Sequence, residues 1–156
     1  MDCRERLQAY LEEQAVWHEF QSHPSAFTAQ EVAASEHLPG RMLAKVVMVR
    51  ADQKLVMLAL PAPAQVDLGR AAAALGPGEV RIAEEHEFAT AFPDCEAGAM
   101  PAFGNLYGVP VHVDRGLTRN ERIVMQAGTH HDTVSLRYAD FERLAEPVVG
   151  AFASGS

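Results

Sequence analysis

Cysteine is scarce in this 156-residue sequence, which contains only Cys3 and Cys95. Two cysteines so far apart do not make the framework of a small disulfide-stabilised domain, and they do not form a C-x-x-C pair. We therefore expect reduced thiols and a cytoplasmic location. A chain of this length fits one domain and can bury a core without cross-links.

Long apolar runs are missing as well. The longest candidate, residues 46–60, is interrupted by polar and charged residues, namely Arg50, Asp52, Gln53 and Lys54. It falls short of the roughly 20 apolar residues that a membrane-spanning helix needs. The N-terminus also lacks the apolar core of a signal peptide. We expect a soluble protein that has no membrane partner.

Positive charge is in deficit, because 13 Lys and Arg residues face 21 Asp and Glu residues and leave a formal net charge of −8. Proteins that bind nucleic acid along its backbone usually carry a basic surface. The composition therefore argues against a general RNA binder and against DNA as a partner. It still permits contact with one end of an RNA, for which a local basic patch is enough.

Apolar periodicity and turn residues predict helices and strands that alternate along the chain. Helices are expected at 2–14, 28–37, 67–75, 84–92 and 140–145, and strands at 16–20, 44–50, 55–60, 80–83, 109–113, 122–126 and 133–137. Thr28 and Glu31 have the spacing of a capping box, and Asp67 can cap the alanine-rich helix. This order predicts an α+β fold with a mixed, largely antiparallel sheet flanked by helices. Residues 1–150 are expected to form one domain, followed by a frayed tail at 151–156.

Lys45 begins an apolar strand, where it shares one face with Val47 and Val49 because strand side chains alternate. The simpler interpretation is a lysine whose stem covers apolar surface while its ammonium reaches water. The alternative is an ammonium held in a pocket, where it would bind a phosphate or an ester oxygen as a point charge. The residues alone favour the simpler interpretation.

The segment 94–109 has little periodicity and is rich in glycine, which is typical of a loop. Its part from Gly98 to Gly104 can be a simple turn. Glycines also permit close backbone approach, so N–H groups here could face an oxyanion. The segment lacks the lysine and hydroxyl ending of a phosphate-binding loop.

The run Gly128-Thr129-His130-His131 suggests a metal site at first sight. Adjacent histidines in a strand point to opposite faces, however, and no other histidine shows zinc-site spacing. We therefore expect no metal, and we interpret His130 as a pocket residue that acts by hydrogen bonding or by steric gating.

Nucleophilic catalysis has weak support. There is no G-x-S-x-G elbow. Cys95 lies between Asp94 and Glu96, and neighbouring carboxylates disfavour a thiolate. A Cys95-dependent thiol enzyme stays open as a less favoured alternative.

In their order along the chain, these features resemble the YbaK/ProX-type aminoacyl-tRNA deacylases, which are relatives of the editing domain inserted in bacterial prolyl-tRNA synthetases. The resemblance covers about His23 to Val148, and its strength lies in the ordered set of motifs. The matching elements are His23-Pro24, Lys45, Leu60-Pro61, Val66-Asp67-Leu68, Gly98-x-x-Pro101-x-Phe103-Gly104, Asp114, Gly128-Thr129-His130 and Tyr138-Ala139-Asp140-Phe141.

The resemblance implies an α+β fold with a pocket over the sheet that accepts the charged 3′ end of tRNA, and it implies no cofactor. The implied catalytic residues are Lys45, Gly98 and Gly104. Lys45 would contact the terminal adenosine's phosphate or sugar, and the glycine loop would hold the aminoacyl group. The implied substrate-binding residues are Met100, Pro101, Phe103, Gly128, Thr129 and His130. Met100 departs from the small or proline residues common at its position, which leaves the substrate open.

The expected function is the hydrolysis, in trans, of the ester of tRNA mischarged with a small amino acid such as Ala, Ser, Cys or Thr. An aminoacyl-tRNA synthetase is a possible further partner. Because the sequence offers no obvious nucleophile, positioning and electrostatics would supply the catalysis. The alternative is an inactive module of the same family that binds a small ligand, a tRNA end or a synthetase.

Overall fold

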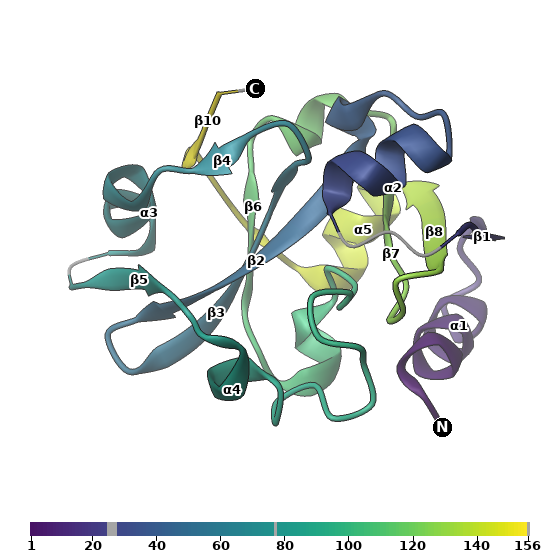
Figure 1. Ribbon diagram of the computed structural model, residues 1–156, viewed down its shortest axis with the longest axis horizontal. Coiled ribbons are helices and arrows are strands. Elements are labelled where there is room, and N and C mark those ends of the chain that lie inside the picture. The colour runs from purple at the N-terminus through teal and green to yellow at the C-terminus, as the bar shows by residue number, and fades with distance from the viewer. Residues whose placement is uncertain (25–27, 77, 156) are drawn as a thin grey trace.

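The computed structural model describes residues 1–24, 28–76 and 78–155, which form a mixed sheet with helices on both faces (Figure 1). The order across the main sheet is β1-β8-β7-β2-β3-β6-β9, and β5 pairs with β2. These strands are β1 (His18–Ser22), β2 (Leu43–Ala51), β3 (Lys54–Pro61), β5 (Val80–Ile82), β6 (Val111–Asp114), β7 (Arg122–Gln126), β8 (Asp132–Arg137) and β9 (Val148–Gly150). The predicted α+β class and mixed sheet are confirmed.

The centre of the sheet is the predicted hairpin of β2 and β3, which pair antiparallel from Ala44↔Pro61 to Ala51↔Lys54. Parallel neighbours flank the hairpin, since β2 pairs with β7 and β3 pairs with β6. Because β2 lies between β3 and β7, Lys45 is held near the middle of the sheet and away from its edges.

Two helices begin where capping residues predict, whereas the last begins at Tyr138, two residues before the expected start. The α-helices are α1 (Cys3–Glu13), α2 (Ala29–Ser35), α3 (Leu68–Leu75), α4 (Glu85–Phe88) and α5 (Tyr138–Ala145). Thr28 and Glu31 form the predicted capping box of α2, and the Asp67 side chain accepts a hydrogen bond from the Arg70 N–H at the start of α3. These local contacts satisfy amide groups that the first helical turn leaves free.

Alternation along β2 divides the core between the two faces of the sheet. Ala44 and Met48 pack into the larger cluster, to which α1, α5 and the loop before β6 contribute. On the opposite face, Leu43 packs with Val32 of α2. Val49 packs with the cluster that includes α3. The face that carries Lys45 is therefore covered at one end by α2 and at the other by α3.

The helix predicted at 84–92 is much shorter in the structure, where α4 ends at Phe88. Tight turns follow, with hydrogen bonds from the Ala91 N–H to the Phe88 carbonyl and from the Phe92 N–H to the Ala89 carbonyl. They turn the chain so that Phe92 is buried against the ring of Tyr107, with the ring centroids 4.8 Å apart. Burial of this aromatic ring outweighs continuation of the helix.

The C-terminal residues are more ordered than the expected frayed tail. Phe152 is fully buried, and β10 (Ala153–Ser154) pairs antiparallel with β4 (Gln65–Val66). The strand β9 and the two strands of this small sheet were not predicted from the sequence, and neither were three short 3-10 helices at Gly40–Met42, Gly104–Tyr107 and Leu117–Arg119. Ser156, the last residue of the predicted tail, lies outside the described residues.

The expectation of two reduced thiols is wrong for this structure, because a disulfide joins Cys3 and Cys95. The two residues are 92 positions apart in the chain, and their Cα atoms lie 4.9 Å apart. Only the packing of α1 against the loop after α4 brings them together. Among the described residues, no helix has both the length and the apolar character needed to cross a membrane.

Candidate functional site

Lys45 lies on β2 in the stretch between the areas covered by α2 and α3. It is half-buried, and burial lowers the pKa of its ammonium below the ordinary value. A partly desolvated ammonium interacts more strongly with an anion than one surrounded by water, because the local dielectric is lower. The position therefore suits a cation that holds a phosphate or an ester oxygen.

Gln126 is Lys45's neighbour on the adjacent strand. The parallel pairing of β2 with β7 matches Leu43 with Val124 and Ala44 with Met125. One position further along each strand come Lys45 and Gln126, whose side chains therefore point to the same face. The Gln126 Nε2 atom is buried and has no hydrogen-bond partner within the described part of the chain. Such a donor is costly to bury unless something bonds it, which makes it a candidate ligand contact.

Sequence reasoning missed Gln126. Its only local signal is a glutamine that closes the apolar run Ile123–Met125 just before Gly128. That pattern is common at the ends of ordinary strands. Its significance comes from the pairing of β7 with β2, which local sequence does not reveal.

Lys45 and Gln126 begin a row of polar residues across the sheet, which we call the polar row. A buried polar cluster continues it. Gln126 pairs with Thr133 of β8. The Thr133 hydroxyl donates to the Glu36 carboxylate at 2.7 and 2.9 Å, and His23 Nε2 lies 3.6 Å from that carboxylate. His23, Glu36 and Thr133 are all buried. This cluster supports the sheet next to Gln126 and gives the His23-Pro24 pair a structural role.

The two predicted loops lie against each other and form one wall, which we define as residues 96–99 and 128–130. The Glu96 N–H donates to the Gly128 carbonyl at 2.8 Å, and the Gly128 N–H donates to the Ala99 carbonyl at 2.9 Å. The His130 N–H donates to Glu96 Oε1 at 2.8 Å, and His130 Nε2 lies 3.0 Å from the Ala97 carbonyl oxygen. Because a carbonyl oxygen can only accept, this contact requires the proton on Nε2.

The wall begins close to the polar row, because Gly128 follows Gln126 by two residues. That separation corresponds to roughly 7 Å along an extended chain. Within the wall, Gly98 has a φ of 82°, and a Cβ built there would lie 3.7 Å from His130 Cε1. The Thr129 hydroxyl donates to Asp132 Oδ2 at 2.7 Å, which stabilises the turn. The structure thus brings together Gly98, Thr129 and His130, with Lys45 on the strand beside β7.

The predicted substrate-binding residues Met100, Pro101 and Phe103 are buried. The Phe103 ring is fully covered and meets the rings of Tyr10 and Phe141 edge to face, at centroid distances of 6.1 and 5.5 Å. Such aromatic pairs stabilise a core beyond the area that they bury. Packing explains these residues, and Met100 and Phe103 belong to the larger core cluster.

Gly104 also has a packing role. A Cβ at this position would lie 2.7 Å from the Val109 carbonyl oxygen and 3.4 Å from the Met57 sulfur. Only glycine fits without displacing the backbone. Gly104 is buried, whereas Gly98 beside His130 would leave room for a Cβ.

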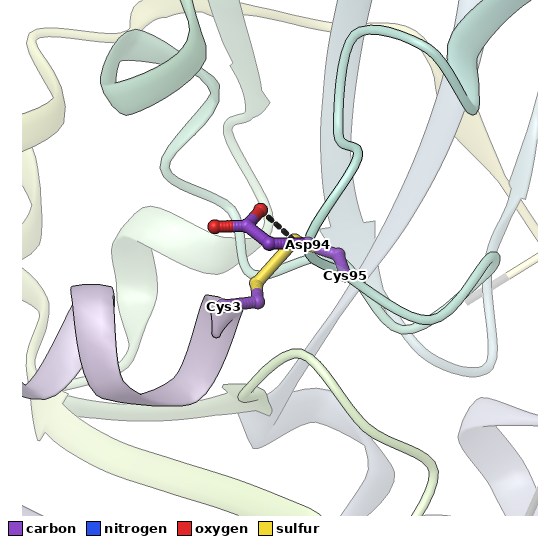
Figure 2. A group of neighbouring side chains, drawn as sticks. All are labelled: Cys3, Asp94 and Cys95. Carbon is purple, nitrogen blue, oxygen red and sulfur yellow. Dashed lines mark hydrogen bonds between the residues drawn. A yellow bond between two sulfur atoms is a disulfide. The ribbon is translucent and has the colours of Figure 1, made fainter. Parts of the chain in front are cut away.

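Within the described ranges, one cluster has the spacing of a metal site, and it consists of Cys3, Asp94 and Cys95 (Figure 2). Its two sulfur atoms are joined in the disulfide, so they are not thiolate ligands in this state. His130 and its exposed neighbour His131 are not part of this cluster.

A basic groove of about 560 Å³ opens near the start of β2. Four arginines line it, namely Arg41, Arg70, Arg115 and Arg119. Its acidic residue, Asp114, is buried and accepts hydrogen bonds from backbone N–H groups. This groove is a local basic surface on an acidic protein, and it could meet the phosphates at one end of a nucleic acid.

Comparison with known proteins identifies the family. The aminoacyl-tRNA editing domain family matches residues 23–144. The chain belongs to this family. The match includes Lys45 and both parts of the wall, and it supports a role in tRNA editing. No curated protein matches the chain.

Solved structures share the fold of this editing domain. A candidate trans-editing enzyme for prolyl tRNA synthetase superposes with a TM-score of 0.84 at 20% identity, covering 98% of each chain. The hypothetical protein APE2540 reaches 0.86 at 14% identity, covering 96% of this chain and 99% of the other. A structure from work on epitope grafting onto scaffold proteins reaches 0.85 at 19% identity, covering 99% and 98%. At these identities the likeness concerns the fold.

Proposed function

We propose that this editing domain is a trans-acting deacylase, which hydrolyses the ester of tRNA mischarged with a small amino acid such as Ala, Ser, Cys or Thr. The observation that carries the proposal is the register of β2 with β7. It places Lys45 and Gln126 one position beyond the paired residues Ala44 and Met125, and Gln126 lies two residues before the Gly128–His130 turn. The family match supports the same reaction class. We place the activity in the cytoplasm, where aminoacyl-tRNA is used.

In this proposal Lys45 binds the terminal phosphate or sugar of the tRNA and fixes the ester over the sheet. The Gln126 amide, whose buried Nε2 is free to donate within the described residues, bonds an oxygen of the substrate. Holding the reacting groups in this way converts a bimolecular reaction into an effectively unimolecular one, which can lower the barrier by several kcal/mol. A held water or the neighbouring ribose hydroxyl then attacks the ester carbonyl.

We assign the oxyanion contact to the backbone at Gly98. Gly104 is less suited, because it is buried. His130 and Thr129 form the side of the pocket that screens the amino acid. Selection is then largely steric, and one methylene group is worth only about 1–3 kcal/mol. The groove lined by Arg41 and its neighbours offers a path for adjacent phosphates, and a synthetase is a further candidate partner.

The test is deacylation of a panel of Ala-, Ser- and Cys-tRNA by wild-type protein and by the variant Lys45→Ala. We expect the variant's kcat/KM to fall on the order of 10²-fold, because the ester loses the contact that fixes it over the sheet. Lys54→Ala is the matched control, because Lys54 is the chain's other lysine and is exposed at the start of β3. Wild-type turnover by Lys45→Ala would refute the role of Lys45.

The alternative is an inactive family member that binds a tRNA end, a small ligand or a synthetase. The acidic net charge favours it modestly. Hydrolysis of none of the three esters by wild-type protein would favour this alternative. The thiol-enzyme alternative predicts that activity is lost in Cys95→Ser, although Cys95 is joined to Cys3 in the structure.

A further inference from the structure

We propose that Cys3 and Cys95 are a redox-active pair whose disulfide holds the wall of residues 96–99 and 128–130 in place. The disulfide links the first turn of α1 to the residue that precedes the wall. The effect that we propose on catalysis rests on the proposed deacylase function. The effect that we propose on the wall rests only on the contacts around the disulfide.

The disulfide touches the wall directly at Gly128. A Cβ built on Gly128 would lie 2.7 Å from both the Cβ and the Sγ atoms of Cys3, and Gly128 has a φ of 99°. Glycine is therefore required twice here, for the backbone conformation and for the close approach of Cys3. Any movement of Cys3 away from Cys95 changes the surface on which this turn rests.

Cys95 is connected to the same turn through the backbone. Its neighbour Glu96 bonds Gly128 through its N–H group and bonds the His130 N–H through its carboxylate. At the other end of the bridge, the Cys3 N–H donates to the Asp94 carbonyl at 3.1 Å. The disulfide and these hydrogen bonds therefore connect α1, through residues 94–96, to the turn at Gly128.

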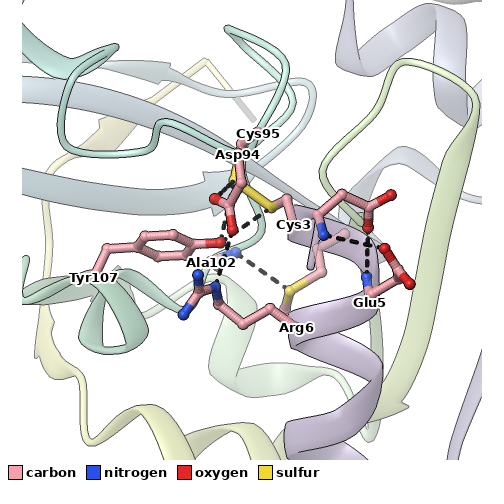
Figure 3. Close-up of a disulfide and its surroundings, with 9 residues drawn as sticks. Cys3, Glu5, Arg6, Asp94, Cys95, Ala102 and Tyr107 are labelled. Atoms are coloured by element: carbon pink, nitrogen blue, oxygen red, sulfur yellow. Dashed lines mark hydrogen bonds and ion pairs between the residues drawn. A yellow bond between two sulfur atoms is a disulfide. The ribbon is translucent and has the colours of Figure 1, made fainter.

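The surroundings of the sulfurs are arranged to hold α1 against this segment (Figure 3). Arg6 bonds Asp94 at 2.9 Å and lies over the ring of Tyr107. The Tyr107 hydroxyl lies 3.4 Å from each sulfur. Burial, and then the nearby Asp94, raises the pKa of Tyr107, so its hydroxyl stays protonated. Burial alone would raise the pKa of Asp94, but hydrogen bonds from Arg6 and Tyr107 hold it below its ordinary value.

These contacts keep the two cysteines near each other after reduction, so the bond can form again. Cys95 is the half-exposed partner, whereas Cys3 is 1% exposed. In oxidation by oxidised glutathione, Cys95 loses its proton, attacks one glutathione sulfur and releases one glutathione thiol. Cys3 then attacks Cys95 in this mixed disulfide and releases the second glutathione. The protein loses two electrons and two protons, and one oxidised glutathione becomes two reduced molecules.

The experiment compares the full-length wild-type protein after equilibration with reduced or with oxidised glutathione, with thiol alkylation and mass spectrometry reporting the fraction bridged. Hydrogen exchange then follows the amides of Glu96, Gly128 and His130. We expect these amides to exchange roughly tenfold faster after reduction, because the contacts that connect α1 to the turn then open locally. The Asp67 amide, bonded to the Phe152 carbonyl far from the bridge, is the internal control and should not change.

The double variant Cys3→Ser/Cys95→Ser should exchange like reduced wild-type protein in both buffers. Equal exchange at Gly128 in the bridged and reduced proteins would overturn the proposal, as would failure to form the bridge in oxidised glutathione. In the deacylation assay, we expect kcat/KM to fall on the order of tenfold on reduction, because the pocket wall loses its fixed position. If exchange responds but neither form hydrolyses any ester, the deacylase function fails and the redox coupling stands.

Discussion

Asp114 offers a sharp test of what holds the C-terminal part of the chain on the sheet. Its carboxylate is 5% exposed and lies at the end of β6. The Oδ1 atom accepts hydrogen bonds from the Phe152 and Ala153 N–H groups, each at 3.0 Å, and Oδ2 accepts one from the Gly116 N–H at 2.8 Å. One side chain thus satisfies three backbone donors from two segments.

The change Asp114→Asn keeps the shape of the side chain and removes its charge. If Oδ1 stays in place, its two hydrogen bonds weaken by about 1 kcal/mol each, because bonds to a charged acceptor are worth about 1.5–3 kcal/mol and neutral ones about 1. The new amide N–H group faces the Gly116 N–H, which then loses its acceptor at a cost of at least about 1 kcal/mol. We expect the free energy of unfolding to fall by about 3 kcal/mol.

Urea denaturation followed by circular dichroism measures this loss. With a denaturant slope of about 2 kcal/mol per molar, the midpoint should fall by about 1.5 M. The matched control is Asp140→Asn, which removes an ion pair with Arg143 at 3.5 Å and should cost less than about 1 kcal/mol.

A loss below about 1 kcal/mol for Asp114→Asn would contradict the account of the three hydrogen bonds. Asp114 lies outside the polar row and the wall but lines the basic groove, where the loss of a negative charge should not weaken the attraction of phosphates, so the folded variant should deacylate no more slowly than wild-type protein under native conditions. A fully stable variant without activity would instead indicate a direct part for Asp114 in the reaction.

Two further outcomes are expected. Gln126→Met should lower kcat/KM roughly tenfold, because the substrate loses a hydrogen bond. The free energy of unfolding should stay unchanged or rise by about 1 kcal/mol, because a buried donor without a partner among the described residues is removed. Unchanged turnover would refute the substrate contact. Burial, and to a smaller extent Lys54, lowers the pKa of His112 in the folded protein. The His112 imidazole of the unfolded chain therefore binds a proton more readily, so the free energy of unfolding should fall as the pH drops below about 6.5. Urea midpoints measured from about pH 7.5 to pH 5 should fall less in His112→Gln, and equal slopes would contradict this account.

Local rules predicted much of the fold because the elements concerned carry their own signals. Thr28 with Glu31 marks the start of α2, and two β-rich runs on either side of a short polar turn mark the β2–β3 hairpin. The shortened α4 and the ordered tail were not predicted. Burial of Phe92 and of Phe152 decides these segments, and burial depends on partners that are distant in sequence.

Some residues of the candidate site were indicated by the sequence, and others are recognised only from the tertiary structure. Ordered motifs indicated Lys45 and the segments around Gly98 and His130, and these residues' roles stay predictions until the variants are assayed. The partner of Lys45 on the neighbouring strand, Gln126, depends on a parallel pairing that joins residues about 80 positions apart. Phe103 belongs to the core, which only its contacts with Tyr10 and Phe141 reveal.

By itself, the sequence determined the class of fold and the family, and it proposed a region for the site, because periodicity, capping and ordered motifs can be read along the chain. The tertiary structure decided which of those residues meet. It joined Cys3 to Cys95 against the expectation of free thiols, and it seated Gly128 on Cys3. Such contacts follow from close packing between segments that are distant in sequence, where the shape of each surface selects its partner.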